Sequence, residues 1–508
     1  MTSSASQADR HPRKAFLALF FVEVWERFGY YGIASILVLY MVQRRGVGDA
    51  RADIIWGTFS ALACSVPMLG GYIGDRVLGA RRTLVLGAIT LALGYLLLSV
   101  PLDETLFPAM GLIALGNGLF KINPNNLISR LYEGEHSKLD ILFTFYYVSQ
   151  NIGSFVSILL TPWIKDHPTW VVVLGPLRFD SWHLAFGLSS LGLTLGLLNY
   201  GAFRRYLRAY GTAPDFKKLH VRKLLAVIAI SLAIAYLLSG VIRYRLAAIG
   251  VVWFFVLLLI YVFVHLLLTG KRHERSRVIA CIIFIVMASV WSVYNQQIYT
   301  SLTLFALRNV EHHILGIPVS AAQFQDLNQF WLILLALPLA WLYQRMDKTK
   351  RGDFSIATKY AAGLYLLAIA FFLYAASSLT AHAGIVSSWW LVAGFAAQSL
   401  GELLISALGL SMVSQLVPEH SRGIIMGAWF LGTGISLYAG GAIASLASIP
   451  SGTVAAATTL SIYTRLFWGL GAVALACAIA ATAITPLLER LMLQRDEEPL
   501  QSGGNVFT

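Results

Sequence analysis

The chain has 508 residues, of which 57% are hydrophobic and only 12% are charged, with a net charge of +13. Soluble domains carry roughly 25% charged residues, so this composition excludes a soluble globular protein, a disordered chain and a secreted disulfide scaffold. The three cysteines lie far apart in apolar stretches, without the spacing of a metal site. Because the Lys and Arg residues fall between apolar runs, the positive charge does not indicate nucleic-acid binding.

Fourteen apolar runs follow one another along the chain, each near or above the length that crosses a bilayer. We therefore expect an all-α membrane protein with fourteen transmembrane helices. The runs lie at 15–43, 54–74, 83–100, 106–129, 141–162, 182–203, 221–242, 246–269, 278–304, 328–345, 356–379, 385–416, 422–447 and 462–488.

The loops between the runs predict the domain plan and the orientation. If the runs at 221–242 and 246–269 are an insertion, six spans precede them and six follow, which is a recurring transporter plan. Most Lys and Arg residues then fall on the side of both termini, so the positive-inside rule places both termini in the cytoplasm. The predicted segments are a tail at 1–14, a six-helix bundle at 15–203, a linker with two extra helices at 204–277, a second bundle at 278–489 and a tail at 490–508.

Charged residues deep inside apolar runs give the first indication of function. A charge at mid-membrane costs at least about 2.5–3.5 kcal/mol, so it normally faces a partner or a watery cavity. Arg465 differs, because it lies near a helix end and its long side chain can reach the membrane surface. The deep charges are Glu23, Glu26, Arg27, Lys121 and Glu402.

Three of these charges share one helical face. Glu23, Glu26 and Arg27 fall at positions i, i+3 and i+4, and Tyr30 and Tyr31 follow one turn later. Two carboxylates beside one guanidinium leave a surplus negative charge. Protonation of a carboxylate would free the arginine to bind another anion, which is the chemistry that a proton-coupled transporter needs.

The two predicted halves carry buried charges of opposite sign. The first half contributes Arg27 and Lys121, and the second contributes Glu402. A cavity between them would complement a zwitterion such as an amino acid or a short peptide, and the charge pattern leaves the length open. Aromatic residues could line this cavity, although each could equally lie in the core or face lipid; these are Trp291, Tyr294 and Trp429.

Several segments match a known family. Residues 23–32 (EVWERFGYYG) resemble the ExxERFxYYG motif of the proton-dependent oligopeptide transporter (POT, or PTR) family within the major facilitator superfamily. Residues 143–154 resemble its fifth-helix motif and residues 401–406 its GExxxS element. Residues 70–82 resemble a loop motif that the whole superfamily shares. The first motif is the specific one.

The resemblance implies a major facilitator fold with twelve core helices, two extra central helices of the bacterial type, and uptake of di- and tripeptides by proton symport and alternating access. It implies proton coupling by Glu23, Glu26 and Arg27, carboxylate binding by Arg27 and Lys121, and amine binding by Glu402. Lys121 and Glu402 would also pair across the halves as a cytoplasmic gate. Other matching cavity positions are Tyr30, Tyr31, Tyr147, Asn151, Asn328, Trp291, Tyr294, Ser406 and Trp429.

Three positions depart from the family pattern. Many members have Arg where this chain has Ala34, a Tyr in the second helix is replaced by Cys64, and an acidic residue of the seventh family helix is replaced by Asn295. The resemblance to the family therefore does not predict which peptide side chains this chain prefers, and it does not predict an external gate at these positions.

Apart from its lipid bilayer, we expect the chain to work with protons and peptides, without metal, cofactor or nucleic acid, as a monomer in a bacterial inner membrane. The alternatives are a proton symporter for nitrate or an amino acid, a membrane enzyme and a receptor-like protein. The sequence contains no nucleophile–base pair or phosphate-binding loop that would favour an enzyme.

Overall fold

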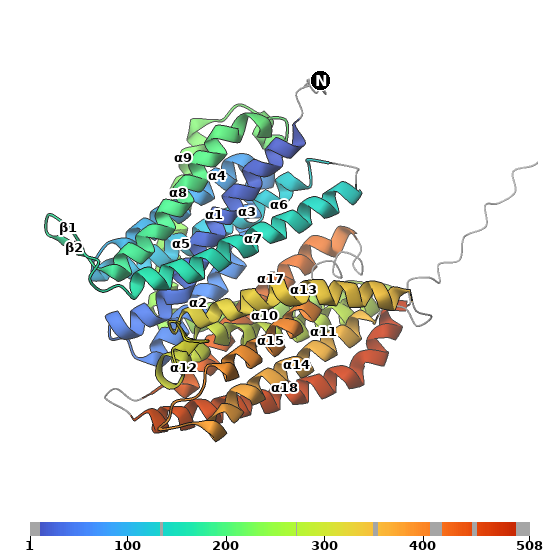
Figure 1. Ribbon diagram of the computed structural model, residues 1–508. Helices are drawn as coiled ribbons and strands as arrows, with labels where there is room; N and C mark the ends of the chain where they lie inside the picture. Colours follow the sequence, from blue (N-terminus) through green and yellow to red (C-terminus); the bar gives the residue numbers. More distant parts are fainter. Residues whose placement is uncertain are drawn as a thin grey trace, which may run out of the picture.

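The computed structural model describes residues 11–132, 136–270, 272–348, 354–406, 419–449 and 455–493. Within these ranges the chain is helical apart from turns and two short antiparallel hairpins (Figure 1). The hairpins pair β1 (Val172–Leu174) with β2 (Leu177–Phe179) and β3 (His313–Ile314) with β4 (Ile317–Pro318).

The helices follow the order of the predicted runs. Proline interrupts two of the early spans, because Pro67 begins α3 and Pro124 lies in the first turn of α6. The first part of the chain forms α1 (Pro12–Leu39), α2 (Asp49–Ser65), α3 (Pro67–Tyr72), α4 (Ala80–Ser99), α5 (Leu106–Lys121), α6 (Asn123–Ile128), α7 (His136–Lys165) and α8 (Ser181–Leu207). The second part forms α9 (Val221–Arg243), α10 (Arg245–Thr269), α11 (Arg272–Asn295), α12 (Ser301–Asn309), α13 (Asp326–Asp347), α14 (Ile356–Ala376), α15 (Trp389–Ser406), α17 (Glu419–Ala444) and α18 (Ala456–Leu493).

Eleven helical stretches in the described residues are long and apolar enough to cross a membrane. Of the remaining predicted spans, α1 carries three charges in its middle, α7 is rich in hydroxyl and amide side chains, and α15 is apolar but shorter. The prediction of an all-α membrane protein is confirmed. The end of the run at 385–416 lies outside the described residues, as do most of the predicted tails.

The two predicted halves form separate layers in Figure 1. In the first, α1 packs on α7 and α8, and α4 packs on α5. In the second, α14 packs on α15 and α18, and α11 packs on α17. The halves meet chiefly along α2 and α17, where a Cβ on Gly57 would lie 3.1 Å from the backbone of Gly441.

The inserted pair of helices lies against both halves. Helix α9 packs on α5 and α2, whereas α10 packs on α17 and α11. Gly111 lets α9 lie very close to α5, because a Cβ there would be 2.3 Å from the carbonyl oxygen of Ala235. The pair therefore bridges the two halves.

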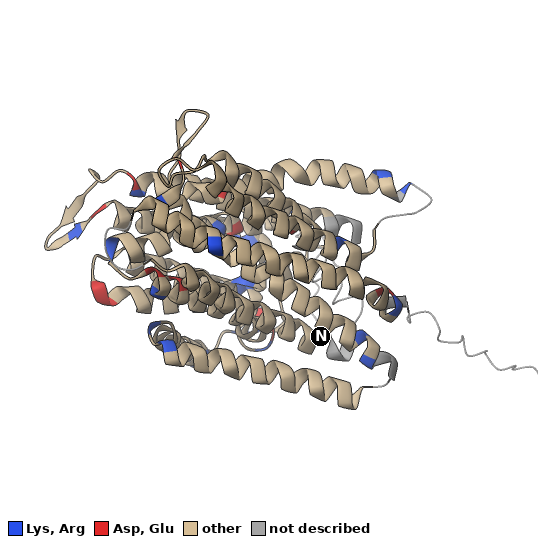
Figure 2. Cartoon of the chain, turned by 90° about the horizontal axis from the view of Figure 1, so that it is seen from below, with Lys and Arg blue, Asp and Glu red and all other residues tan. Residues whose placement is uncertain are grey.

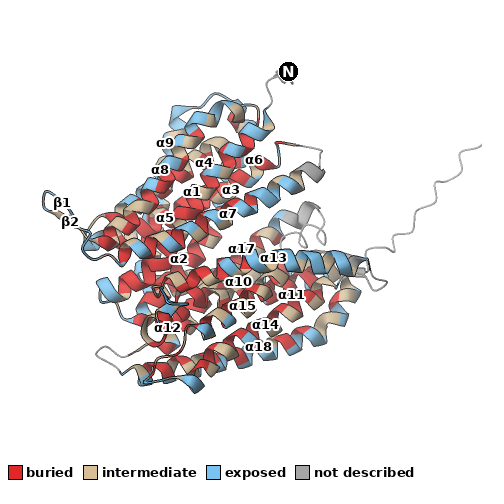
Figure 3. Cartoon of the chain, in the orientation of Figure 1, coloured by how far each residue is buried: buried red, intermediate tan, exposed pale blue. Residues whose placement is uncertain are grey.

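The two ends of the bundle differ. Both β-hairpins lie at one end, which we call the hairpin end, and α1 begins and α18 ends at the other, which we call the termini end (Figure 1). Most Lys and Arg residues lie toward the helix ends (Figure 2), and buried residues fill the interior of both halves (Figure 3).

Polar contacts close the hairpin end between the halves. Arg308 donates to both carboxylate oxygens of Asp49, at 2.6 and 2.9 Å, and the backbone N–H of Ile449 donates to the same carboxylate at 3.4 Å. Nearby, Gln325 donates to the carbonyl oxygen of Ser35 at 3.1 Å. The predicted ion pair of Lys121 with Glu402 is not formed in this conformation, since neither residue has an ion-pair partner among the described residues.

Candidate functional site

The motif of α1 folds into a buried ion cluster. Glu23 and Glu26 are fully buried, and Arg27 is 7% exposed. The Nε atom of Arg27 lies 2.9 Å from Glu23 Oε1 and 2.8 Å from Glu26 Oε2. The helical spacing of the three residues brings them together, as predicted. The cluster therefore contains two carboxylates and one guanidinium away from solvent.

Helix α7 covers this cluster. A Cβ on Gly153 would lie 2.3 Å from the carbonyl oxygen of Val24, so glycine lets α7 lie directly against α1. This approach places Gln150, whose amide donates to Glu23 Oε1 at 3.0 Å. Neither oxygen of Glu26 accepts a hydrogen bond within the described part of the chain. Among the described contacts, a proton on Glu26 would therefore compete only with its ion pair to Arg27.

A cavity of about 240 Å³ lies between the two halves beside the cluster. It brings together Arg27, Tyr30, Tyr31 and Lys121, which the sequence predicted as substrate-binding residues. Both predicted cations thus face one cavity. The other lining residues are Trp56, Ser60, Ala63, Cys64 and Asn117 from the first half and Ser292, Asn295, Gln296, Tyr299, Thr433 and Leu437 from the second.

Lys121 is the last residue of α5, and α6 begins two residues later at Asn123, with Pro124 in its first turn. Its side chain is half-buried, and the described residues include no acidic group within ion-pair distance of it. Glu26 lies within electrostatic range of this lysine. The ammonium group is therefore available to a ligand in the cavity.

Glu402 lies on α15 in the second half. The side-chain amide of Asn328, on α13, donates to Glu402 Oε2 at 3.0 Å and also lies 3.2 Å from Ser399 Oγ. Tyr31 and Tyr147 of the first half are both within electrostatic range of this carboxylate. The structure therefore places predicted residues of both halves around one polar region.

The remaining predicted residues are not among those that line the cavity beside the cluster. Tyr147 is 51% exposed, and its carbonyl oxygen accepts a hydrogen bond from Asn151 at 2.9 Å. Trp291 packs near the α15 backbone, 3.5 Å from where a Cβ on Gly401 would lie. Trp429 is half-buried on α17, and Ser406 is the last residue of α15.

Tyr294 does not line the cavity, which corrects the prediction. Its hydroxyl donates to the carbonyl oxygen of Leu470 at 2.7 Å, and its ring meets Phe371 edge-on. The side chain is 2% exposed and lies on the side of α11 that faces α14 and α18. The aromatic pattern did not reveal which face of α11 each ring occupies.

Several buried charges lie outside the predicted apolar runs. Asp49, Asp53 and Asp326 are each at most 5% exposed, and Arg308 joins the first of them across the halves. Each lies just outside a predicted apolar run, where the sequence predicts a loop. If the predicted runs had been extended toward their N-termini to include these aspartates, the aspartates would have counted as charges inside a membrane span.

The three residues that depart from the family pattern lie in two different environments. Cys64 and Asn295 line the cavity, whereas Ala34 is buried in the packed part of α1. Within the described ranges no group of three or more His, Cys, Asp or Glu residues could hold a metal ion.

Comparison with known proteins gives consistent matches. The model of the POT family (PTR2) matches residues 81–466. The dipeptide and tripeptide permease A of Erwinia pyrifoliae is 38% identical, with 97% of this chain and 99% of the relative covered. The permease of the same name from Escherichia coli is also 38% identical, with 94% and 93% covered.

Solved structures agree with these matches. The crystal structure of tetrameric PepTSo2 superposes with a TM-score of 0.85 at 39% identity, covering 94% of this chain and 99% of that one. A structure that concerns substrate recognition in proton-dependent oligopeptide transporters has a TM-score of 0.80 at 38% identity, with the same coverage.

Proposed function

The chain belongs to the POT family and is a proton-coupled transporter of di- and tripeptides, and from this premise we propose how its residues divide the work. The peptide lies in the cavity between the halves. Its carboxylate binds Arg27 and Lys121, and its amine binds Glu402. The observation that carries this assignment is that both cations face one cavity while the carboxylate lies in the opposite half.

Proton coupling follows from the buried cluster. Two carboxylates compensate one arginine, so the cluster carries one surplus negative charge, and burial of such a charge is costly. A proton on Glu26 or Glu23 neutralises the surplus. Arg27 is then paired with only one charged carboxylate, so its guanidinium can also bind the peptide carboxylate. Proton binding and peptide binding therefore favour each other.

The gating roles differ between the two ends. Asp49 and Arg308 hold the hairpin end closed in this conformation, and Lys121 with Glu402 forms the opposite gate when the termini end closes. The cation distribution supports an orientation with the termini end in the cytoplasm of a bacterial inner membrane. The conformation seen here then faces the cytoplasm. Because the cavity forms within a single chain, the monomer is the transporting unit.

Uptake into proteoliposomes tests this function. Purified protein should accumulate labelled dialanine when the interior is alkaline relative to the medium, and unlabelled di- and tripeptides should compete. Nitrate and free alanine serve as the controls for the alternative substrates. Accumulation of either one, without competition by dialanine, would contradict the peptide assignment.

A further inference from the structure

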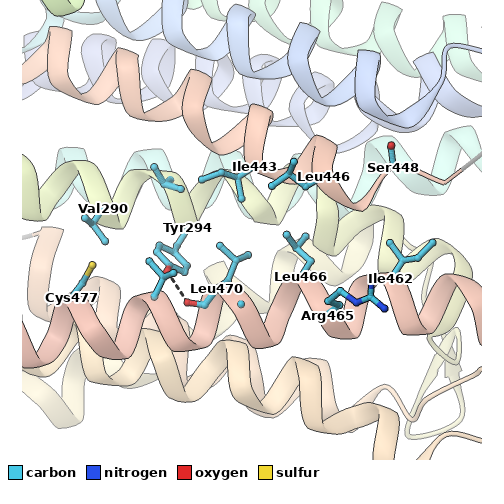
Figure 4. Close-up of a pocket in the computed structure, with 13 residues that line it drawn as sticks. Val290, Tyr294, Ile443, Leu446, Ser448, Ile462, Arg465, Leu466, Leu470 and Cys477 are labelled. Carbon is cyan, nitrogen blue, oxygen red and sulfur yellow. Dashed lines mark hydrogen bonds between the residues drawn. The ribbon is translucent and has the colours of Figure 1, made fainter.

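A long apolar groove lies in the second half, separate from the peptide cavity (Figure 4). Its volume is about 790 Å³. Residues of α17 and α18 form its sides, and α11, on which both of these helices pack, forms its floor. None of its lining residues lines the cavity that holds Arg27 and Lys121.

Most of the groove offers no hydrogen-bonding group to a ligand. The hydroxyl of Tyr294 on the floor is already bound to the carbonyl oxygen of Leu470 (Figure 4). The surfaces around it are aliphatic and include Val290, Ile443 and Leu466. A peptide segment lying here would leave its backbone groups without partners, which is costly in an apolar environment. A hydrocarbon chain has no such groups.

One end of the groove is polar. Arg465 and Ser448 lie at its hairpin end (Figure 4). Arg465 is exposed, and no ion pair or hydrogen bond joins its guanidinium to another described residue. No acidic residue lines the groove. The polar end therefore favours an anion.

The polar end also lies at the level where the spanning helices end. Tyr463, two residues before Arg465, accepts a hydrogen bond from Arg308 near the end of α12. Arg308 in turn binds Asp49 at the start of α2. Arg465 is thus positioned at the membrane boundary, where phospholipid headgroups lie.

The length of the groove matches one leaflet. Along α18 it runs from Ile462 to Cys477, and the twelve helical steps from Arg465 to Cys477 span about 18 Å at the helical rise. One leaflet contributes half of a hydrocarbon core of about 30 Å. A groove that begins at the boundary therefore reaches about as deep as an acyl chain does.

We propose that this groove binds one anionic phospholipid from the leaflet at the hairpin end. Its acyl chain lies between α17 and α18, and its phosphate binds the guanidinium of Arg465, which matches phosphate oxygens in geometry and charge. Because no carboxylate is present to attract a choline group, an anionic lipid binds more tightly than a zwitterionic one.

Two substitutions separate the headgroup contact from the groove itself. Arg465→Gln removes the charge but keeps a long side chain. Gly469→Phe fills the groove, because a Cβ at Gly469 meets no atom within 4 Å. The matched controls are Arg178→Gln, an exposed arginine on β2, and Gly250→Phe, an equally open glycine on α10.

Native mass spectrometry of the full chain in mild detergent, titrated with phosphatidylglycerol or phosphatidylcholine, measures the binding. We expect the wild-type chain to bind one phosphatidylglycerol with preference over phosphatidylcholine. Arg465→Gln should weaken phosphatidylglycerol binding about tenfold, the loss expected for one charge-assisted hydrogen bond. It should weaken phosphatidylcholine binding less, because the choline group offsets the charge of its phosphate. Gly469→Phe should weaken both lipids.

The two controls should bind both lipids like the wild-type chain. Dialanine uptake by each variant confirms that it is folded, independently of lipid binding. The proposal is overturned if Arg465→Gln and Gly469→Phe bind phosphatidylglycerol as tightly as the wild type. It is also overturned if the control variants, Arg178→Gln and Gly250→Phe, lose as much affinity as Arg465→Gln and Gly469→Phe.

Discussion

Among single residues, the two glutamates of α1 have the most direct consequence for coupling. Both are fully buried and share one arginine. Replacing Glu23 or Glu26 by Gln keeps the shape and removes a titratable group. We expect each variant to lose accumulation of dialanine driven by a proton gradient while retaining exchange of peptide across the membrane. Counterflow in proteoliposomes measures the exchange.

The matched control is Glu104→Gln, at an exposed glutamate before α5. It should accumulate dialanine like the wild type. Full gradient-driven accumulation in both α1 variants would contradict a coupling role for these glutamates.

Glu402 provides a second test at the level of one side chain. Asn328 already donates to its carboxylate, and Glu402→Gln removes the charge that would attract a peptide amine. Peptides with a free amine should bind at least about tenfold more weakly, since a charge-assisted hydrogen bond contributes about 1.5–3 kcal/mol. Peptides with a blocked amine should lose much less. Competition against labelled dialanine measures both, and equal losses would argue against the amine contact.

Among the helical elements, the approach of α3 to α5 depends on glycine. A Cβ on Gly70 would lie 2.0 Å from the carbonyl oxygen of Gly118, which is backbone and cannot rotate away. On the adjacent Gly71 a Cβ would meet only side-chain atoms, at 3.5 Å or more. Gly70→Ala should therefore destabilise the protein by about 1–3 kcal/mol, as overpacking does.

Gly71→Ala, which makes the same chemical change one residue later, should be nearly neutral. Thermal unfolding of the two variants in the same detergent compares them. Equal melting temperatures would mean that the two helices can separate without cost.

The helix positions were largely predictable from the sequence, because long apolar runs have few ways to satisfy their backbone in a membrane. Their ends were less predictable. Helix α2 begins at Asp49 rather than at residue 54, because its first turn is stabilised by partners from the other half. Those partners, Arg308 among them, cannot be identified from a local pattern.

The candidate site shows the same limit. The cluster of Glu23, Glu26 and Arg27 depends on spacing within one helix and was predicted. Tyr294 was assigned to the cavity incorrectly, because its direction depends on how α11 packs against α14 and α18. Contacts between distant segments decide such positions.

At the scale of the whole molecule, the ion pair of Asp49 with Arg308 joins the two halves at the hairpin end. Each variant that breaks it, Asp49→Asn or Arg308→Gln, should shift the equilibrium toward opening at this end. Loss of a hydrogen bond to a charged group is worth about 1.5–3 kcal/mol, enough for a shift of roughly tenfold or more in population. Distances between spin labels placed on the two β-hairpins measure the opening.

Arg44→Gln is the matched control for this shift. Arg44 donates to Asp180 at 2.8 Å at the same end of the molecule, but both residues belong to the first half. Burial raises the pKa of Asp180, yet hydrogen bonds from His183 and Arg44 outweigh it and keep the pKa well below its ordinary value. This pair therefore stays ionised in any transport assay. If Arg44→Gln opened the hairpin end as much as Asp49→Asn or Arg308→Gln, the ion pair between the halves would have no special role.

The two inserted helices connect to each other through Tyr244 alone, between Arg243 and Arg245. Helix α9 is fixed to the first half by the glycine contact at Gly111, whereas α10 lies against the second. When the halves rock, one extended peptide unit must absorb the relative rotation. Because this connection is so short, the inserted pair of helices limits how far the two halves can rotate relative to each other.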